Sequence, residues 1–131
     1  MNCQEDRGRD RAKEQAKFQL KSVCEMVSRL KSEDSEISEI VREEIELDAI
    51  SVEVRSSWHS PGQDDSDGEY RICLCTGGPA VQIVGELDSY NQPYNATLQY
   101  QDWFTEWEDY DLAKEEEANL VRYCSVFYFG G

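Results

Sequence analysis

The sequence is poor in basic residues over most of its length, and it has no long apolar run. After residue 31 it contains five Lys/Arg against 23 Asp/Glu, a net of −18 within a chain whose total is −15. So acidic a segment repels nucleic acid and anionic membranes and is attracted to basic surfaces. No apolar run approaches the ~18 residues that cross a bilayer. We therefore predict neither direct nucleic-acid binding nor membrane association.

Histidine and paired cysteine motifs are also scarce. The chain has one histidine, His59, and five cysteines without framework spacing. Cys73 and Cys75 lie two residues apart, so with Cys24 or Cys124 and His59 they could form a zinc or thiol site. A structural zinc site usually needs a second paired unit, which is missing here. We therefore predict reduced thiols that pack as small apolar groups, with no metal, no cofactor and no catalytic residue.

Two further stretches resemble ligand-binding loops only in part. The acidic run at residues 64–69 aligns with a calcium loop through Gly68, but Gln63 and Leu74 then occupy its first and twelfth positions. Both ends of the loop fail, so a solvated acidic loop is the better interpretation. Residues 77–79, Gly-Gly-Pro, lack the Lys-Ser/Thr of a phosphate loop, and we interpret them as a turn.

The first 31 residues differ from the rest, with eight Lys/Arg against five Asp/Glu, a net of +3. Apolar residues there recur every three or four positions, which predicts a helix from about Glu5 to Leu30, with residues 1–8 frayed around Gly8. Residues 32–34 supply cap candidates for a second helix that ends near Leu47. Its apolar face would comprise Ile37, Ile40, Val41 and Ile45. We expect the two helices to form an antiparallel hairpin.

From residue 50 onward the apolar period changes from 3.6 to 2, which is typical of strands. Alternating or β-rich runs cover residues 50–55, 70–76, 80–87 and 95–103, and a last helix begins near Leu112. Consecutive strands with short connections favour an antiparallel meander. We predict one α+β domain over residues 1–131 in the order ααββββα, with a four-stranded sheet covered by helices on one face.

An acidic aromatic segment, residues 101–110, is the main candidate for an interaction site. Trp and Tyr often anchor protein interfaces, and here they alternate with carboxylates that no basic residue of the segment neutralises. The alternative is that Trp103 and Phe104 close the core while the acids face water. A secondary acidic face on the second helix could imitate DNA phosphates. The predicted contacts are Trp103, Glu106, Trp107, Glu108, Asp109 and Tyr110, with Glu39, Glu43 and Glu46 on the second face.

Four short strings resemble a family of small acidic proteins from phages and mobile elements of gut bacteria. They are SVEVRSSW at residues 51–58, CTGGPAV at 75–81, LQYQDW at 98–103 and FYF at 127–129. The resemblance implies a mobile-element origin. The charged N-terminus and the lack of a long apolar run predict a soluble protein of the cytoplasm, here that of a bacterial host. By analogy of context it also implies a protein that blocks host defences such as CRISPR effectors or restriction enzymes. It assigns no residue roles.

Three hypotheses follow from these observations. The first is an acidic inhibitor that occupies the basic surface of a host nuclease or Cas effector. The second is a ligand-binding protein or enzyme that uses the sheet face with Cys73, Cys75 and His59. The third is a homodimer assembled through the helix in residues 1–31, acting as a structural or regulatory protein of a mobile element.

Overall fold

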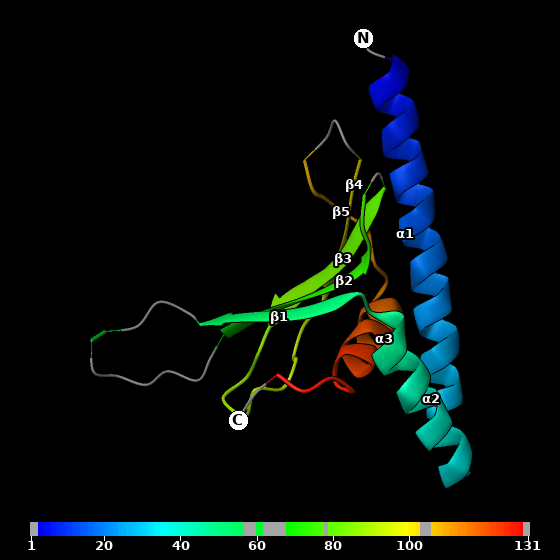
Figure 1. Ribbon diagram of the computed structural model, residues 1–131, viewed down its shortest axis with the longest axis vertical. Helices are drawn as coiled ribbons and strands as arrows, with labels where there is room; N and C mark the ends of the chain where they lie inside the picture. The colour runs from blue at the N-terminus through cyan, green and yellow to red at the C-terminus, as the bar shows by residue number, and fades with distance from the viewer. Residues whose placement is uncertain (1–2, 57–59, 62–67, 78, 103–105, 130–131) are drawn as a thin grey trace.

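The computed structural model describes residues 3–56, 60–61, 68–77, 79–102 and 106–129, with side chains from residue 10 onward except that of Ser56. Trp103, Phe104, His59 and the acidic residues 64–67 lie outside this description. Figure 1 shows one sheet with its helices gathered on one side. None of the described helices has the length and apolar character needed to cross a membrane.

The two N-terminal helices form the predicted antiparallel hairpin (Figure 1). Helix α1 spans Cys3–Leu30 and helix α2 spans Ser35–Asp48. Asp34 caps α2, because its Oδ1 accepts the N–H of Glu36 at 3.0 Å. The apolar positions of α1 are buried at intervals of three or four residues, as the sequence predicts: Ala12, Ala16, Leu20, Val23, Val27 and Leu30.

The predicted apolar face of α2 is only half right. Val41 and Ile45 are fully buried, whereas Ile37 is 42% and Ile40 is 53% exposed. The physical reason is that α2 packs mainly against α1, and a single neighbouring helix covers only a narrow stripe of its surface. Two apolar side chains of α2 therefore remain in contact with water.

The sheet is an antiparallel meander in the order β1-β2-β3-β4-β5. The prediction of four strands is wrong, because a fifth strand of two residues pairs with β4. That pairing joins Gln99 to Asp109 and Tyr100 to Glu108, and two residues are too few to produce a periodic pattern. The strands are β1 (Ser51–Ser56), β2 (Gly68–Cys75), β3 (Ala80–Glu86), β4 (Thr97–Gln101) and β5 (Glu108–Asp109).

The core lies between the sheet and the helices. Ile72 of β2, Ile83 of β3 and Leu98 of β4 are fully buried on the covered face. Helix α3 (Lys114–Cys124) packs against α1 and contributes Leu120 and Tyr123, both 0% exposed. Because strand side chains alternate between faces, the residues between these apolar positions point to the opposite face, which no described helix covers.

The C-terminal segment returns to the sheet after α3. The Glu116 side chain accepts the N–H of Ala113 at 2.9 Å and thereby caps the start of α3. After the helix, the ring of Phe129 packs on Tyr70 of β2 with centroids 5.3 Å apart. The ring of Phe127 meets that of Tyr123 edge-on, with centroids 5.6 Å apart. The apolar tail therefore closes one end of the core.

Candidate functional site

The acidic aromatic segment does not form one continuous surface. Glu106 and Trp107 are exposed, and Trp107 lines a hollow on the uncovered face of the sheet. Glu108 and Asp109 form β5. Tyr110 turns inward, and its ring meets Tyr100 edge-on with centroids 6.5 Å apart. Of the predicted contacts in this segment that the structure describes, Glu106, Trp107 and Asp109 are exposed to a partner, Trp107 at 37%.

The secondary acidic face forms one ridge on α2. Glu36, Glu39, Glu43 and Glu46 are all exposed and follow one another at three- or four-residue intervals, on the side of the helix opposite Val41 and Ile45. We call this set the acidic ridge. Like charges at such spacings destabilise a helix by about 0.2–0.5 kcal/mol per pair. Arg42 beside Glu39 and Glu46, and the position of Glu36 in the first turn, offset part of this repulsion.

An apolar ridge runs beside the acidic ridge on α2. It consists of Ile37, Ile40 and Leu47, and Leu47 is 85% exposed. Ile40 follows Glu36 by four residues and Leu47 follows Glu43 by four, so the two ridges adjoin on the helix surface. Helix α2 thereby presents charged and apolar groups together, as protein interfaces commonly do.

The acidic aromatic segment and α2 lie far apart. Figure 1 places β5 beside the upper part of the molecule, toward the N-terminal half of α1, and α2 beside the C-terminal half of α1. A partner must therefore extend along the molecule to contact both. The sequence places these residues on two acidic segments but gives no information on the distance between them.

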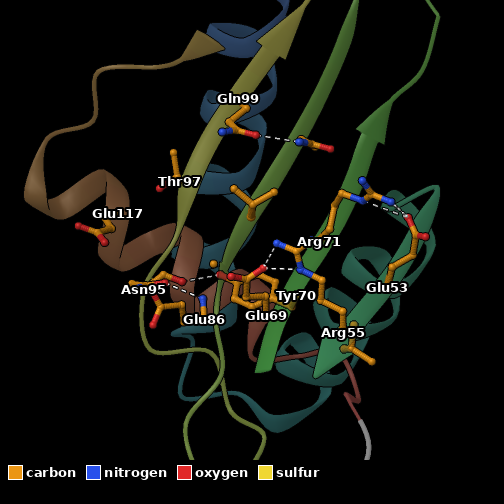
Figure 2. A pocket seen from close by; sticks show the side chains of 14 residues that line it. Glu53, Arg55, Glu69, Tyr70, Arg71, Glu86, Asn95, Thr97, Gln99 and Glu117 are labelled. Atoms are coloured by element: carbon orange, nitrogen blue, oxygen red, sulfur yellow. Dashed lines mark hydrogen bonds and ion pairs between the residues drawn. The ribbon is translucent and has the colours of Figure 1, made fainter. Parts of the chain in front are cut away.

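The uncovered face of the sheet, here called the open face, holds two adjoining hollows. One has a volume of about 680 Å³ and the other about 520 Å³, and both are bordered by Glu53, Arg71 and Gln82. These volumes fall within the range of small-ligand pockets, about 300–1,000 Å³. Figure 2 shows that the larger hollow is lined mainly by polar side chains from β1 to β4 and by Glu117 of α3.

Cross-strand ion pairs occupy the β1 and β2 side of the open face. Arg71 Nη2 lies 2.9 Å from Glu53 Oε1, and Arg55 donates through Nε to Glu69 Oε2 at 2.6 Å (Figure 2). All four residues are exposed, and such pairs contribute at most about 1 kcal/mol each. Because both guanidinium groups face carboxylates, these two arginines offer no unbalanced positive charge to an anionic ligand.

Amide side chains continue the polar surface across β3, β4 and β5. Gln82 Nε2 donates to Gln99 Oε1 at 2.8 Å, and Gln99 Nε2 donates to Asp109 Oδ1 at 2.9 Å. The three side chains face one another because Gln82 pairs with Gln99, and Gln99 with Asp109, in the strand register. This chain of hydrogen bonds holds β5 to the sheet and fixes Asp109, one of the predicted contacts.

Two hydrogen bonds to Asn95, one from Tyr70 and one from Glu86, hold together one end of the larger hollow. Tyr70 donates its hydroxyl proton to the carbonyl oxygen of Asn95 at 2.6 Å, and Asn95 Oδ1 accepts the N–H of Glu86 at 2.7 Å. Burial, with a smaller contribution from the nearby Cys124, raises the pKa of Tyr70 far above its usual value. Tyr70 therefore acts as a hydrogen-bond donor here and is a poor proton source for chemistry.

The cysteines differ in their surroundings, because Cys73 and Cys75 border the smaller hollow of the open face whereas Cys124 lies in the core. Cys124 is buried in the core, as predicted, and burial raises the pKa of its thiol to about 12. Cys73 is half-buried, and burial raises its pKa too, so its thiol stays protonated near neutrality. A protonated thiol is a poor nucleophile. Cys73 donates weakly to the carbonyl oxygen of Cys75 at 3.6 Å. Among the described residues, no group of three His, Cys, Asp or Glu side chains is placed to hold a metal.

The open-face residues were not singled out as a group from the sequence. The alternation of Val52 and Val54 with Glu53 and Arg55 does predict a charged outer face for one strand. Which strands lie beside it, and in what register, is needed to place Arg71 opposite Glu53. The sequence matches no protein-family model, and no curated protein or solved structure matches it either.

Proposed function

We propose that the protein is an acidic inhibitor that binds the basic, nucleic-acid-binding surface of another protein, with α2 as its main docking element. The observation that carries the proposal is the pairing of the acidic ridge with the exposed apolar ridge on α2. A charged helix face alone is compatible with simple solvation. Exposed Ile40 and Leu47 beside it indicate a surface that gains from being covered by a protein.

The spacing of the acidic ridge suits a surface that binds nucleic acid. From Glu36 to Glu46 the helix rises about 15 Å at 1.5 Å per residue, and it carries four carboxylates over that length. One strand of DNA carries a phosphate about every 3.4 Å along its axis. The two linear charge densities are therefore similar. Arg42, the only basic residue of α2, follows Glu39 by three positions and precedes Glu46 by four, so it borders the acidic ridge and offsets part of its charge.

The proposed partners are bacterial defence nucleases and Cas effectors. They bear basic surfaces for nucleic acid, and residues 50–129 resemble proteins of mobile elements, which encounter such defences. Glu106, Trp107 and Asp109 form the proposed second contact, used by partners long enough to reach from α2 to β5. The observation on α2 supports the inhibitor class, and the resemblance supports the choice of target.

The test is displacement of labelled duplex DNA from a panel of purified restriction enzymes and Cas effectors. The variant E39Q/E43Q/E46Q removes three charges from α2, and the control D10N/E14Q/E25Q removes three exposed charges from α1. With about 0.2–1 kcal/mol per exposed charge, the α2 variant should lose about 3- to 150-fold in inhibition. The control should change inhibition less than about 2-fold, since its charges lie outside the contact.

The salt dependence supplies an independent readout. Contacts between exposed charges are screened within about 8 Å at physiological ionic strength. Direct binding of the protein to the DNA-free partner should therefore weaken steeply between about 0.05 M and 0.5 M salt, whereas displacement also reflects the salt dependence of DNA binding. Equal losses for the two triple variants would contradict the role of α2. Binding to the DNA-free partner that stayed constant over the salt range would contradict recognition through charge. A panel with no inhibited member would contradict the target class.

A further inference from the structure

The first strand of the sheet is an open edge. Strand β1 is the first in the sheet order and pairs only with β2 among the described strands. Figure 1 shows β1 at the front of the sheet, with no other element drawn in front of it. The outward backbone N–H and C=O groups of an edge strand can pair with another strand, and proteins usually protect such edges.

Two exposed valines make this edge unusual. Val52 is 37% and Val54 is 52% exposed, although their cross-strand neighbours Ile72 and Tyr70 are buried. Both valines therefore lie on the covered face of the sheet, at a position that the helices do not reach. The opposite face of β1 carries Glu53 and Arg55, already paired with β2. The edge thus offers apolar groups on one face and alternating charges on the other.

We propose that β1 pairs antiparallel with β1 of a second copy of this chain, around a two-fold axis at Val54, so that one continuous sheet crosses the dimer. This inference does not depend on the proposed docking of α2. An axis perpendicular to the sheet keeps every side chain on its own face, so the axis must pass through a residue position of β1. Only a few registers satisfy this condition.

Charge selects one of these registers. An axis at Glu53 places that carboxylate opposite its own copy, which is repulsive. An axis at Val52 places Glu53 opposite Ser51 and gains no charge pair. An axis at Val54 places Val54 opposite Val54 and, twice, Glu53 of one copy opposite Arg55 of the other. The sequence Glu53-Val54-Arg55 is therefore complementary to itself only in this register.

The same register extends the ion pairs that already exist on the open face. Within one chain, Arg71 faces Glu53 and Arg55 faces Glu69 in the strand register. Across the dimer the rows become Arg71 and Glu53 of one copy followed by Arg55 and Glu69 of the other, with alternating sign throughout. Opposite charges on neighbouring strands stabilise a sheet. Within these four-residue rows no residue meets a like charge directly across from it; outside them, Glu69 lies opposite Glu86 of β3.

The proposal is tested by light scattering, which measures the mass in solution across a dilution series. The salt concentration is about 0.15 M, because repulsion between two chains of net charge −15 is then screened beyond about 8 Å. The wild-type chain should reach twice its 15.1 kDa mass. Val54→Lys places two cations at the axis and should give 15.1 kDa. Because Val54 is 52% exposed, this variant should keep its circular dichroism spectrum.

Two charge reversals give the sharpest test. Arg55→Glu puts two acids on β1, and Glu53→Arg puts two bases there, so each variant alone should be monomeric. Mixed in equal amounts they should form a heterodimer, because each Glu of one then faces an Arg of the other. Disruption of the fold cannot produce this rescue. As a control for assembly through α1, Phe18→Ser alters a side chain 67% exposed on that helix and should leave the dimer intact.

Three outcomes would overturn the proposal. The first is a wild-type chain that stays at 15.1 kDa throughout the series. The second is a mixture of the two charge reversals that remains monomeric. The third is a dimer that survives Val54→Lys and is lost in Phe18→Ser, which would place the interface on α1.

Discussion

Gly85 of β3 provides the most direct test of the packing described above. A Cβ added at this position would lie 2.3 Å from the carbonyl oxygen of Asn95 and 2.6 Å from Cε1 of Tyr70. Carbon atoms do not approach so closely, so Gly85→Ala must move β3, the segment that precedes β4, or the tyrosine ring. Any of these movements disturbs the hydrogen bond from Tyr70 to Asn95.

The size of the effect follows from two contributions. Overpacking of a well-packed core costs about 1–3 kcal/mol, and loss of the hydrogen bond adds about 0.5–1.5 kcal/mol. The free energy of unfolding should therefore fall by about 2–4 kcal/mol. Unfolding entropy scales as about 2.1 cal/mol/K per residue, or about 0.28 kcal/mol/K for 131 residues. The expected fall in Tm is about 7–14 °C.

Gly77→Ala serves as the matched control. Gly77 has φ of +93° and no atom within 4 Å of an added Cβ, so the same substitution there costs only backbone strain. That strain is about 1 kcal/mol, or about 4 °C in Tm. Scanning calorimetry of both variants decides the matter. A Gly85→Ala protein that melts no lower than Gly77→Ala would refute the close approach. Adding Tyr70→Leu should not rescue Gly85→Ala, because the nearest atom belongs to the backbone.

Two further predictions concern α2 and the core. Ile45→Ala should lower the free energy of unfolding by about 2–4 kcal/mol, because Ile45 is fully buried. Leu47 is 85% exposed, so Leu47→Ala should change the free energy of unfolding by less than about 0.5 kcal/mol. Urea titrations measure both, and similar losses would contradict the orientation of α2. Stability should fall as the pH rises above about 9, because burial raises the pKa of Cys124 from 9.0 to about 12 and those of Tyr70 and Tyr123 above 10.0. The unfolded chain loses these protons first, so each group lowers the free energy of unfolding by up to about 1.4 kcal/mol per pH unit. Urea midpoints from about pH 8 to 11 measure this decline, which Cys124→Ala should flatten. A free energy of unfolding unchanged at pH 11 would contradict the burial of these groups.

The sequence predicts most helices and strands of this fold, but not the contacts that depend on how the elements pair. The change of apolar period at residue 50 separates the helical hairpin from the strands, and short connections predict the meander that the strand order confirms. The fifth strand was not predicted because Glu108 and Asp109 form too short a run to show a period. Its place in the sheet depends on its register with β4 and on the hydrogen bond from Gln99 to Asp109. Neither depends on local periodicity.

The sequence predicts which acidic residues the candidate site contains, but not which apolar residues are exposed beside them. The acids of α2 follow from helical spacing, and all four members of the acidic ridge are exposed. Ile37 and Ile40 show the limit of that reasoning, because a 3.6-residue period predicts which side chains share a face but not how wide a neighbour covers it. Their exposure, with that of Leu47, is the observation on which the proposed docking role of α2 rests. It depends on α2 having one main neighbour.

Helix α2 and strand β1 are adjacent in the chain, and one hydrogen bond fixes the end of α2 close to the start of β1. Tyr123 of α3 donates its hydroxyl proton to Asp48, the last residue of α2, at 2.8 Å, just before β1 begins at Ser51. This bond holds α2 in a fixed direction relative to the sheet. A dimer joined at Val54 would then hold two acidic ridges at a fixed separation. Linked sites that engage together bind about 10²–10⁴-fold more tightly than one alone, provided that the geometry permits both contacts. A partner with two basic surfaces, such as a dimeric restriction enzyme, would meet that condition, whereas a partner with one surface would gain nothing from the dimer.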